Sequence, residues 1–530
     1  MSKKLIEFIE KYENKVSPIF TKYNDTFFKA SISGNAKLYK EAANLEIQLS
    51  KIHSEKNDFK YLDSLIKSGE IKDPVLKREL DVLYRTYKKN QVDPELLEEI
   101  ILSANKIEEI YSTFRANIAG EKLSDNEIDL ILKNSIDSKK LKSVWEASKQ
   151  IGEEVEQKVI SLVKLRNKMA ADLGYDNFHE MSLELDELSY AQLDYLFDDL
   201  EQKIKPEFIK IKSEIDAYIS TRLNIAATEL MPWHYEDKFF QQGPEIYDID
   251  FDVFFKGKNI VALTSKFFKG IGLEIDDLIK NSDLFEKEGK YQHAYCMHVD
   301  KSGDVRVLCN IKDDYRWAGT MLHEFGHAVY DKYIDMNLPW HLREPAHIFT
   351  TEAIAMLFGR MAADTNWLNK IANVNKEKAK QIENIAFKKL KLEQLVFSRW
   401  VQVVYRFEKE MYANPEQDLN LLWKNLVEKY QLLKYPENRN KPDWAAKIHI
   451  ALYPAYYQNY MLGELLASQL FFYISNKILG TSDFIDRVEV GNFLKENFFK
   501  YGALLNYNEL IEKSTKGNFT VDSYIKQFTK

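Results

Sequence analysis

The chain has 530 residues, of which 45% are hydrophobic and 29% charged, a composition that indicates a folded globular protein and excludes a disordered one. Its net charge is −8 and its pI about 5.9, so a nucleic-acid partner is not expected. The two cysteines are too few for a disulfide framework. No run of apolar residues approaches the length that a membrane span needs.

The first half of the chain predicts helices almost without interruption. Glycine and proline are scarce, at 19 and 12 residues, and apolar residues recur at spacings of three and four from Leu5 to about Arg222. Acidic residues interrupt the apolar ones in the first ten residues, so no secretory leader is expected and the cytoplasm is the default location. The periodicity fails near Met231, where a loop with a proline is predicted to cross between two halves.

One segment reads as a β-hairpin. Two alternating runs between Tyr291 and Asn310 flank the turn signal Asp300-Lys-Ser-Gly-Asp304. If Ser302-Gly303 forms a two-residue loop, Cys296 faces Cys309 across the strands, and we expect both thiols to be reduced. Four helical stretches are predicted after the hairpin, followed by a shorter helical tail: about 317–334, 350–363, 383–412 and 455–478.

The strongest chemical signal is His323-Glu324-Phe325-Gly326-His327. Positions four apart lie on the same face of a helix, so the two imidazoles can share a zinc ion. Glu324 lies beside them and can act as general base toward the water at the metal.

A hydrolytic zinc needs a third protein ligand, and Glu352 is the candidate. It lies in an apolar stretch that is predicted to be a largely buried helix. A buried carboxylate is costly unless a metal or another partner compensates its charge. The alternative is a glutamate in the first turn of a helix, favoured by the helix dipole.

These residues resemble the gluzincin peptidases. The match extends through Leu342-Arg-Glu344 and Thr351-Glu-Ala-Ile354, and it combines features of the angiotensin-converting-enzyme-like peptidyl-dipeptidases with features of the thimet-oligopeptidase-like family. The resemblance implies one zinc ion per chain, held by His323, His327 and Glu352. It also implies an all-α (mainly helical) two-lobed clamshell with a deep central channel and one small β-hairpin near the active site.

The same resemblance divides the chain, as a single peptidase unit, into regions with different roles. Residues from about 1 to 240 are expected to form an N-terminal helical lobe that includes the channel lid. Residues from about 241 to 480 are expected to form the zinc-binding catalytic region, and those from about 481 to 530 a C-terminal helical tail.

A second match contains Lys447, His449 and a series of tyrosines. From the residues alone, this aromatic spacing is typical of core packing. The resemblance implies that Tyr460 donates its phenol to the developing oxyanion, which is transition-state stabilisation, and that His449 binds a substrate carbonyl. It also makes Tyr457 the candidate for the substrate's C-terminal carboxylate, with Tyr453 as the competing choice.

A third match is His293-Ala294, on the first strand of the hairpin. It resembles a substrate-lining pair on an edge strand, with which an extended peptide can pair its backbone; the alternative for His293 is an ordinary strand residue. Lys256 aligns with a carboxylate-binding glutamine of the converting-enzyme type. Lys256 and Lys447 would then both face an anionic C-terminus, which favours release of dipeptides.

The chain also departs from the converting-enzyme type. Met356 stands where that type has an acid that orients a zinc histidine, and the sequence names no replacement. Gln458 and Asn459 stand where a chloride-sensing arginine is found, so chloride activation through that residue is not expected. The other histidines show no paired spacing and are predicted to be structural or on the surface: His53, His179, His234, His298, His341 and His347.

The sequence therefore predicts a zinc-dependent peptidase that acts on short oligopeptides and releases C-terminal dipeptides. Three alternatives stay open: an oligoendopeptidase of the thimet type, a metallocarboxypeptidase, and an inactive relative that serves as a binding scaffold. The expected partners are short peptides, with neither nucleic acid nor membrane. The oligomeric state is not determined, and a monomer is compatible with the sequence.

Overall fold

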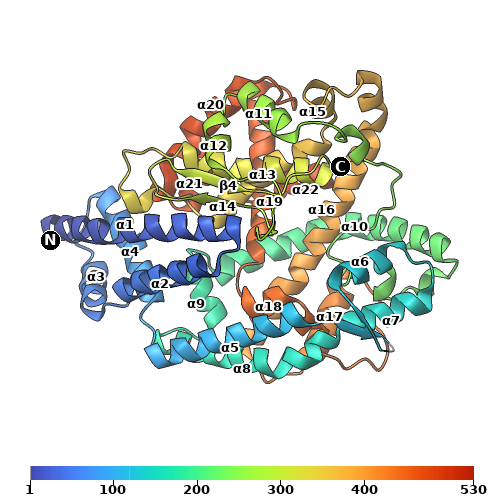
Figure 1. Ribbon diagram of the computed structural model, residues 1–530, viewed down its shortest axis with the longest axis horizontal. Coiled ribbons are helices and arrows are strands. Elements are labelled where there is room, and N and C mark those ends of the chain that lie inside the picture. Colours follow the sequence, from blue (N-terminus) through green and yellow to red (C-terminus); the bar gives the residue numbers. More distant parts are fainter. Residues whose placement is uncertain (1, 119, 530) are drawn as a thin grey trace. The chain divides into compact units, whose positions relative to one another are not determined.

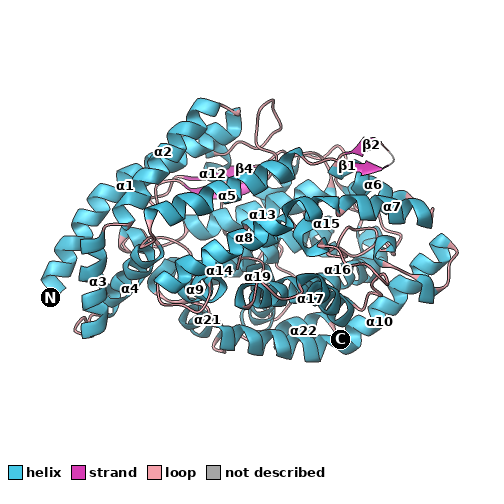
Figure 2. Ribbon diagram, turned by 90° about the horizontal axis from the view of Figure 1, so that it is seen from below, coloured by secondary structure: helices cyan, strands magenta, loops and turns pink. Residues whose placement is uncertain are grey.

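The computed structural model describes residues 2–118 and 120–529, and this part of the chain is mainly helical (Figure 1). Its strands form two small antiparallel sheets of two strands each, which Figure 2 shows among the helices. The prediction of a mainly helical fold with a small hairpin is confirmed. None of the described helices combines the length and apolar character that crossing a bilayer requires.

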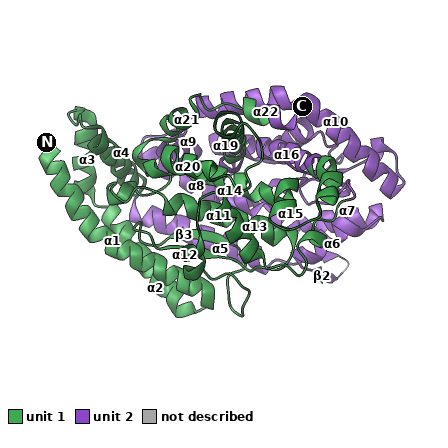
Figure 3. Cartoon of the chain, turned by 90° about the horizontal axis from the view of Figure 1, so that it is seen from above, with its two compact units in different colours: residues 1–91, 249–386, 462–524 green, residues 92–248, 387–461, 525–530 purple. Residues whose placement is uncertain are grey.

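The chain forms two compact units, coloured separately in Figure 3. Unit 1 comprises residues 1–91, 249–386 and 462–524. The elements that lie wholly within it are α1 (Ser2–Ser33), α2 (Ala36–His53), α3 (Lys56–Ser68), α4 (Pro74–Lys89), α11 (Ile260–Gly270), α12 (Asp276–Asn281), β3 (Tyr295–His298), β4 (Val305–Leu308), α13 (Tyr315–Lys332), α14 (Ile348–Gly359), α15 (Thr365–Lys370), α20 (Val488–Asn497) and α21 (Tyr507–Thr515).

Unit 2 comprises residues 92–248, 387–461 and 525–530. It contains α5 (Pro94–Thr113), β1 (Ala116–Ile118), β2 (Glu121–Leu123), α6 (Asp125–Asn134), α7 (Ser138–Ser148), α8 (Gln150–Asp172), α9 (Phe178–Leu185), α10 (Tyr190–Leu223), α17 (Leu419–Leu426) and α18 (Ile448–Leu452). Three helices continue from one unit into the other: α16 (Lys376–Ala413), α19 (Gln458–Tyr473) and α22 (Asp522–Phe528). The assignment of separate roles to residues 1–240, 241–480 and 481–530 stays a prediction.

The first four helices of unit 1 enclose a common hydrophobic core. On α1, Leu5, Ile9, Tyr12 and Val16 recur at helical spacing and are buried. They pack in one cluster with buried residues of α2, α3 and α4 and with Trp340. Trp340 thus connects these helices to the segment between α13 and α14.

The predicted helices of the second half differ from the structure mainly at their ends. The stretch expected at 455–478 begins at Gln458, because Ala455 has a left-handed backbone (φ 55°) that interrupts the helix after α18. The stretch expected at 350–363 is α14 followed by a 3₁₀ turn at Arg360–Ala363. The hairpin β1–β2 was not predicted, because its three-residue strands are too short to show an alternation.

The predicted β3–β4 hairpin exists, but its predicted register was wrong. Cys296 lies opposite Val307 rather than Cys309, and the loop is longer than two residues. The Asp300 carboxylate accepts hydrogen bonds from the backbone N–H groups of Ser302 (2.7 Å) and Asp304 (3.0 Å). This side-chain turn stabilises the longer loop, and Gly303 adopts the positive φ that closes it.

Helices α13 and α14 approach each other closely at Gly326. A β-carbon at this position would lie 2.7 Å from Ala355 Cα and 3.2 Å from the Ile354 carbonyl oxygen, both of them backbone atoms of α14. The glycine inside the His-Glu-Phe-Gly-His motif therefore permits the two helices to pack backbone against backbone.

We expect Gly326→Ala to lower the free energy of unfolding of the zinc-free protein by about 1–3 kcal/mol, as overpacking of a close contact does. Gly319, on the same helix, is the matched control, because its β-carbon would meet nothing closer than 3.6 Å. Gly319→Ala should be neutral or stabilising, since alanine is the better helix former. Urea denaturation measures both variants, and equal effects would contradict the close approach.

Candidate metal centre

Helix α13 brings the two histidines of the motif together. It begins after Asp314, whose carboxylate accepts a hydrogen bond from Trp317 N. His323 and His327 lie one turn apart, with ring centroids separated by 4.9 Å and Nε2 atoms by 3.3 Å. Burial lowers the pKa of His323 to about 4 and lowers that of His327 as well. Both imidazoles are therefore neutral near pH 7, the form that binds a metal.

Helix α14 directs Glu352 at the two imidazoles. Glu352 Oε2 lies 3.6 Å from His323 Nε2 and 3.9 Å from His327 Nε2. Glu352 is 7% exposed, burial raises its pKa to about 7, and Oε2 has no hydrogen-bond partner among the described residues. Two neutral imidazoles and one buried carboxylate, with ligand atoms within 4.8 Å of one another, form a donor set that fits a hydrolytic zinc.

The residue that orients one zinc histidine is Thr351. Its hydroxyl oxygen lies 2.7 Å from His327 Nδ1. The hydrogen bond holds the imidazole in one orientation and, with Nδ1 as donor, leaves the lone pair of Nε2 directed at the metal position. Sequence reasoning missed this partner, because a hydroxyl next to a ligand carries no spacing signal of its own.

We expect Thr351→Val to weaken zinc binding by about 10–100-fold, the usual cost of losing such a partner of a ligand. Valine keeps the shape of threonine and removes only the hydroxyl. Thr350 is the matched control, because its hydroxyl donates to the His347 carbonyl and takes no part in the histidine pair. Competition with a chromophoric chelator measures the zinc Kd, and equal values for both valine variants would contradict the orienting role.

Glu324 lies next to the ligands and is also buried, at 8% exposure. Burial and, secondly, the charge of Glu352 raise its pKa to about 8. A carboxylate in such surroundings binds protons more strongly than one in water. This property suits a group that must accept a proton from water and pass it on.

In unit 2, Lys447 is surrounded by aromatic rings and a glutamine. Its Nζ donates to Gln241 Oε1 at 2.7 Å and lies 5.5 to 5.7 Å from the ring centroids of Phe239, Trp400 and Tyr457. Burial lowers its pKa to about 8. Sequence reasoning missed Gln241, because the contact joins positions 206 residues apart in the chain.

The predicted histidine and tyrosines of unit 2 form one aromatic cluster. His449 contacts the rings of Tyr453 and Tyr457, with centroids 5.6 and 5.4 Å apart. The Tyr457 hydroxyl accepts a hydrogen bond from Trp400 Nε1 at 2.7 Å, and the ring of Tyr460 lies 5.4 Å from that of Tyr457. Tyr453 is the most exposed member, at 52%.

The remaining predicted residues lie in unit 1. His293 and Ala294 precede β3 rather than lying within it, so the expectation that they are strand residues was wrong. The chain bends at His293, before the pairing with β4 begins at Tyr295. Lys256 is exposed, on the turn that follows the 3₁₀ helix Asp252–Phe254.

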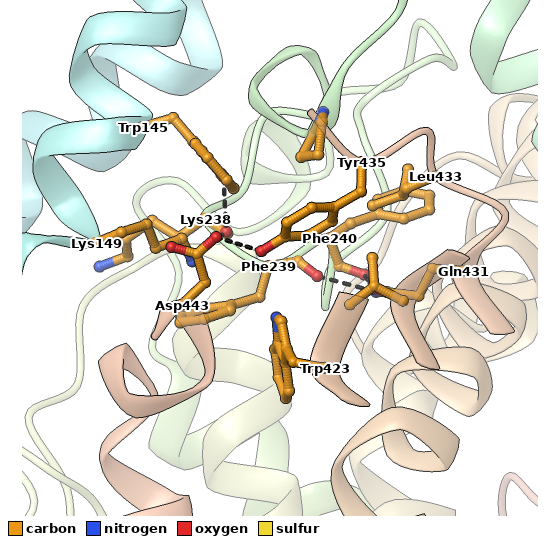
Figure 4. Close-up of a pocket in the computed structure, with 12 residues that line it drawn as sticks. Trp145, Lys149, Lys238, Phe239, Phe240, Trp423, Gln431, Leu433, Tyr435 and Asp443 are labelled. Carbon is orange, nitrogen blue, oxygen red and sulfur yellow. Dashed lines mark hydrogen bonds between the residues drawn. The ribbon is translucent and has the colours of Figure 1, made fainter. Parts of the chain in front are cut away.

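A small cavity of about 20 Å³ lies in unit 2 beside the loop that carries Gln241. Figure 4 shows the aromatic and charged side chains that line it, among them Trp145, Phe239 and Trp423. The buried Lys149 donates to the Lys238 carbonyl at 2.7 Å and lies over the Phe239 ring. The volume suits about one water molecule, so the cavity is a packing defect rather than a peptide site.

Two family models match the chain. Residues 280–529, which include His323, Glu352 and Tyr460, match peptidase family M3, and residues 1–231 match the angiotensin-converting enzyme family. Each match spans just under half of the chain, and both families are gluzincin metallopeptidases with a catalytic zinc ion. No curated protein matches the chain. The resemblance predicted from the sequence is confirmed, and it extends to the N-terminal helices.

Proposed function

Because the chain is a zinc metallopeptidase of the gluzincin group, we propose that it releases dipeptides from the C-terminus of short peptides. The observation that carries this proposal is the surroundings of Lys447. Its ammonium donates to the neutral Gln241 amide, and it forms no ion pair with the described residues. Burial lowers the pKa of Lys447 more than the nearby charge of Asp237 raises it. A buried cation that forms no ion pair is suited to bind the free carboxylate of a peptide.

The chain's own residues then have defined roles in hydrolysis. Bound zinc supplies Lewis acidity toward the scissile carbonyl and lowers the pKa of water. Glu324 takes the proton from the attacking water on its carboxylate and delivers it to the leaving amine. Tyr460 donates its hydroxyl proton in a hydrogen bond to the developing oxyanion.

Other residues hold the peptide. His449 donates to a substrate carbonyl, and Tyr457, with Tyr453 as the competing choice, joins Lys447 at the terminal carboxylate. Lys256 is a second cation for that carboxylate, and His293 and Ala294, which precede β3, contact the substrate. We further propose that the protein cleaves only short peptides and that it acts in the cytoplasm.

The second candidate is an oligoendopeptidase, favoured by the match of peptidase family M3 to the segment that carries the zinc ligands. The test is digestion of one peptide as the free acid and as its C-terminal amide, with products identified by mass spectrometry. Dipeptides from the acid, with the amide cleaved at least about tenfold more slowly, are expected. Equal internal cleavage of both would establish the oligoendopeptidase instead, and single amino acids would establish a carboxypeptidase.

We expect Lys447→Met to lower kcat/KM for the free-acid peptide by about 10–100-fold, which corresponds to the loss of one charge-assisted contact of about 1.5–3 kcal/mol. The amidated peptide should be affected by less than about threefold, because it lacks the charge that Lys447 binds. Lys441→Met is the control, since Lys441 forms an exposed ion pair with Glu153. Equal losses for acid and amide would show that Lys447 only supports the fold.

A further inference from the structure

The carboxylate of Glu352 is held differently from the imidazole of His327. The Thr351 hydroxyl oxygen lies 2.7 Å from His327 Nδ1, whereas Glu352 Oε2 has no hydrogen-bond partner among the described residues. The Glu352 side chain is nevertheless buried and directs Oε2 at both imidazoles. The direction of Oε2 is therefore determined by the atoms that pack around the stem of the side chain.

Helix α19 packs against this stem through Gly463, and both residues belong to unit 1. A β-carbon at position 463 would lie 3.0 Å from Glu352 Cβ, 3.0 Å from Met356 Sδ and 3.4 Å from the Ala353 backbone nitrogen. Non-bonded carbon atoms are in favourable contact at about 3.5–4.0 Å, so a methyl group here would press on the stem of the ligand. The sulfur of Met356 can move aside by a rotation of its side chain, whereas Glu352 Cβ is fixed to the backbone of α14.

The two helices are also fastened to each other close to this contact. Glu464, the next residue of α19, forms an ion pair with Arg360, which directly follows α14, and each of these side chains is only 10% exposed. Arg360 also lies 3.5 Å from the hydroxyl of Ser468, one turn further along α19. A side chain at position 463 would therefore displace Glu352 rather than separate the helices.

We propose that Gly463 is a positioning residue for the third zinc ligand. The space that its hydrogen leaves permits α19 to pack on α14 while Glu352 directs Oε2 at His323 and His327. A displacement of a few tenths of an ångström is enough to matter, because the groups of a metal site must be held within about 0.5 Å of their productive positions. The inference rests on the role of Glu352 in the proposed function and extends it to a residue of another helix.

Gly463→Ala should weaken zinc binding by at least about tenfold, which is the lower end of the cost of losing a residue that orients a ligand. Gly491→Ala is the matched control on α20. Its β-carbon would overlap the Ile271 carbonyl oxygen and lie 3.0 Å from Leu273 Cγ, so it overpacks unit 1 where no zinc ligand is touched. This control should lower the Tm of the zinc-free protein and leave the zinc Kd unchanged. Circular dichroism measures the Tm, and competition with a chromophoric chelator measures the Kd.

Two backgrounds show whether the effect acts through the ligand. In Glu352→Gln, Gly463→Ala should weaken zinc binding much less than in the parent protein, because two substitutions that affect one interaction are not additive. In Met356→Ala, the loss should persist, because that substitution removes the contact with sulfur and leaves the contact with Glu352 Cβ. If Gly463→Ala alone does not fold, the zinc Kd of the Met356→Ala double variant is compared with that of Met356→Ala.

Three results would overturn the proposal: a folded Gly463→Ala variant that binds zinc as tightly as the parent, a loss that is equally large in the Glu352→Gln background, or a loss that Met356→Ala abolishes. Glu352→Gln alone tests the ligand itself. An unchanged zinc Kd for that variant would reject the ligand and this inference together, whereas a weakened one beside an unchanged Gly463→Ala would reject only the inference. None of these measurements depends on which peptides the protein cleaves.

Discussion

Glu324→Gln is expected to retain one zinc ion per chain and to lower kcat by about 10²–10⁴-fold. The amide cannot accept the proton of the attacking water, whereas the metal is held by His323, His327 and Glu352, which are unchanged. Glutamine has nearly the shape of glutamate, so the buried position should keep its packing. Metal analysis and peptide hydrolysis on the same sample separate loss of the base from loss of the ion.

The control for this variant is Asp331→Asn, which makes the same change of carboxylate to amide at another buried site on α13. Asp331 contacts Cys296 and none of the zinc ligands, so its variant should keep kcat within about threefold of the parent protein. Removal of a general base is expected to lower activity by at least about 100-fold. If Glu324→Gln retained more than about a tenth of the parent activity, Glu324 would not be the base.

Glu352→Gln should weaken zinc binding by at least about 100-fold, and activity at limiting zinc should be lost with it. The substitution replaces a charged ligand by a neutral amide. Loss of a residue that only hydrogen-bonds to a ligand already weakens metal binding by about 10–100-fold, so loss of the ligand itself should cost more. The zinc-free variant should be at least as stable as the zinc-free parent, because the substitution removes a buried charge that lacks a hydrogen-bond partner at Oε2. Chelator competition and thermal unfolding measure the two effects.

Glu408→Gln is the matched control. Glu408 is 1% exposed, and its Oε2 also has no hydrogen-bond partner among the described residues. It lies in unit 2 and belongs to none of the clusters of possible metal ligands found among the described residues. It should leave zinc affinity unchanged. A Glu352→Gln variant that binds zinc as tightly as Glu408→Gln would contradict the role of Glu352 as third ligand.

The histidines of unit 1 show which side-chain clusters a spacing pattern can reveal. His323 and His327 were recognised from the sequence, because a spacing of four places both rings on one face of a single helix. Glu13, Glu79 and His341 also lie close together, but they come from three separate elements, and their approach depends on how α1 and α4 pack around Trp340. No spacing in the sequence indicates such a cluster.

The amino-acid sequence by itself determined the mainly helical fold, the pair His323 and His327, and the hairpin after Tyr291. Each of these features depends on periodicity within one element or on turn residues a few positions apart. A short stretch of sequence is therefore enough to predict it. The choice of Glu352 combined burial, which is also local, with resemblance to a family.

Only the tertiary structure decided which groups support these residues. The sequence did not predict the hydrogen bond between His327 and Thr351 or the contact of Gln241 with Lys447, and it gave the wrong partner for Cys296, which lies opposite Val307. The physical reason is that each depends on the packing of separate segments or on a side chain that closes a turn. Such contacts are selected by the fold as a whole, whereas helical spacing is already determined by the backbone hydrogen bonds of a single segment.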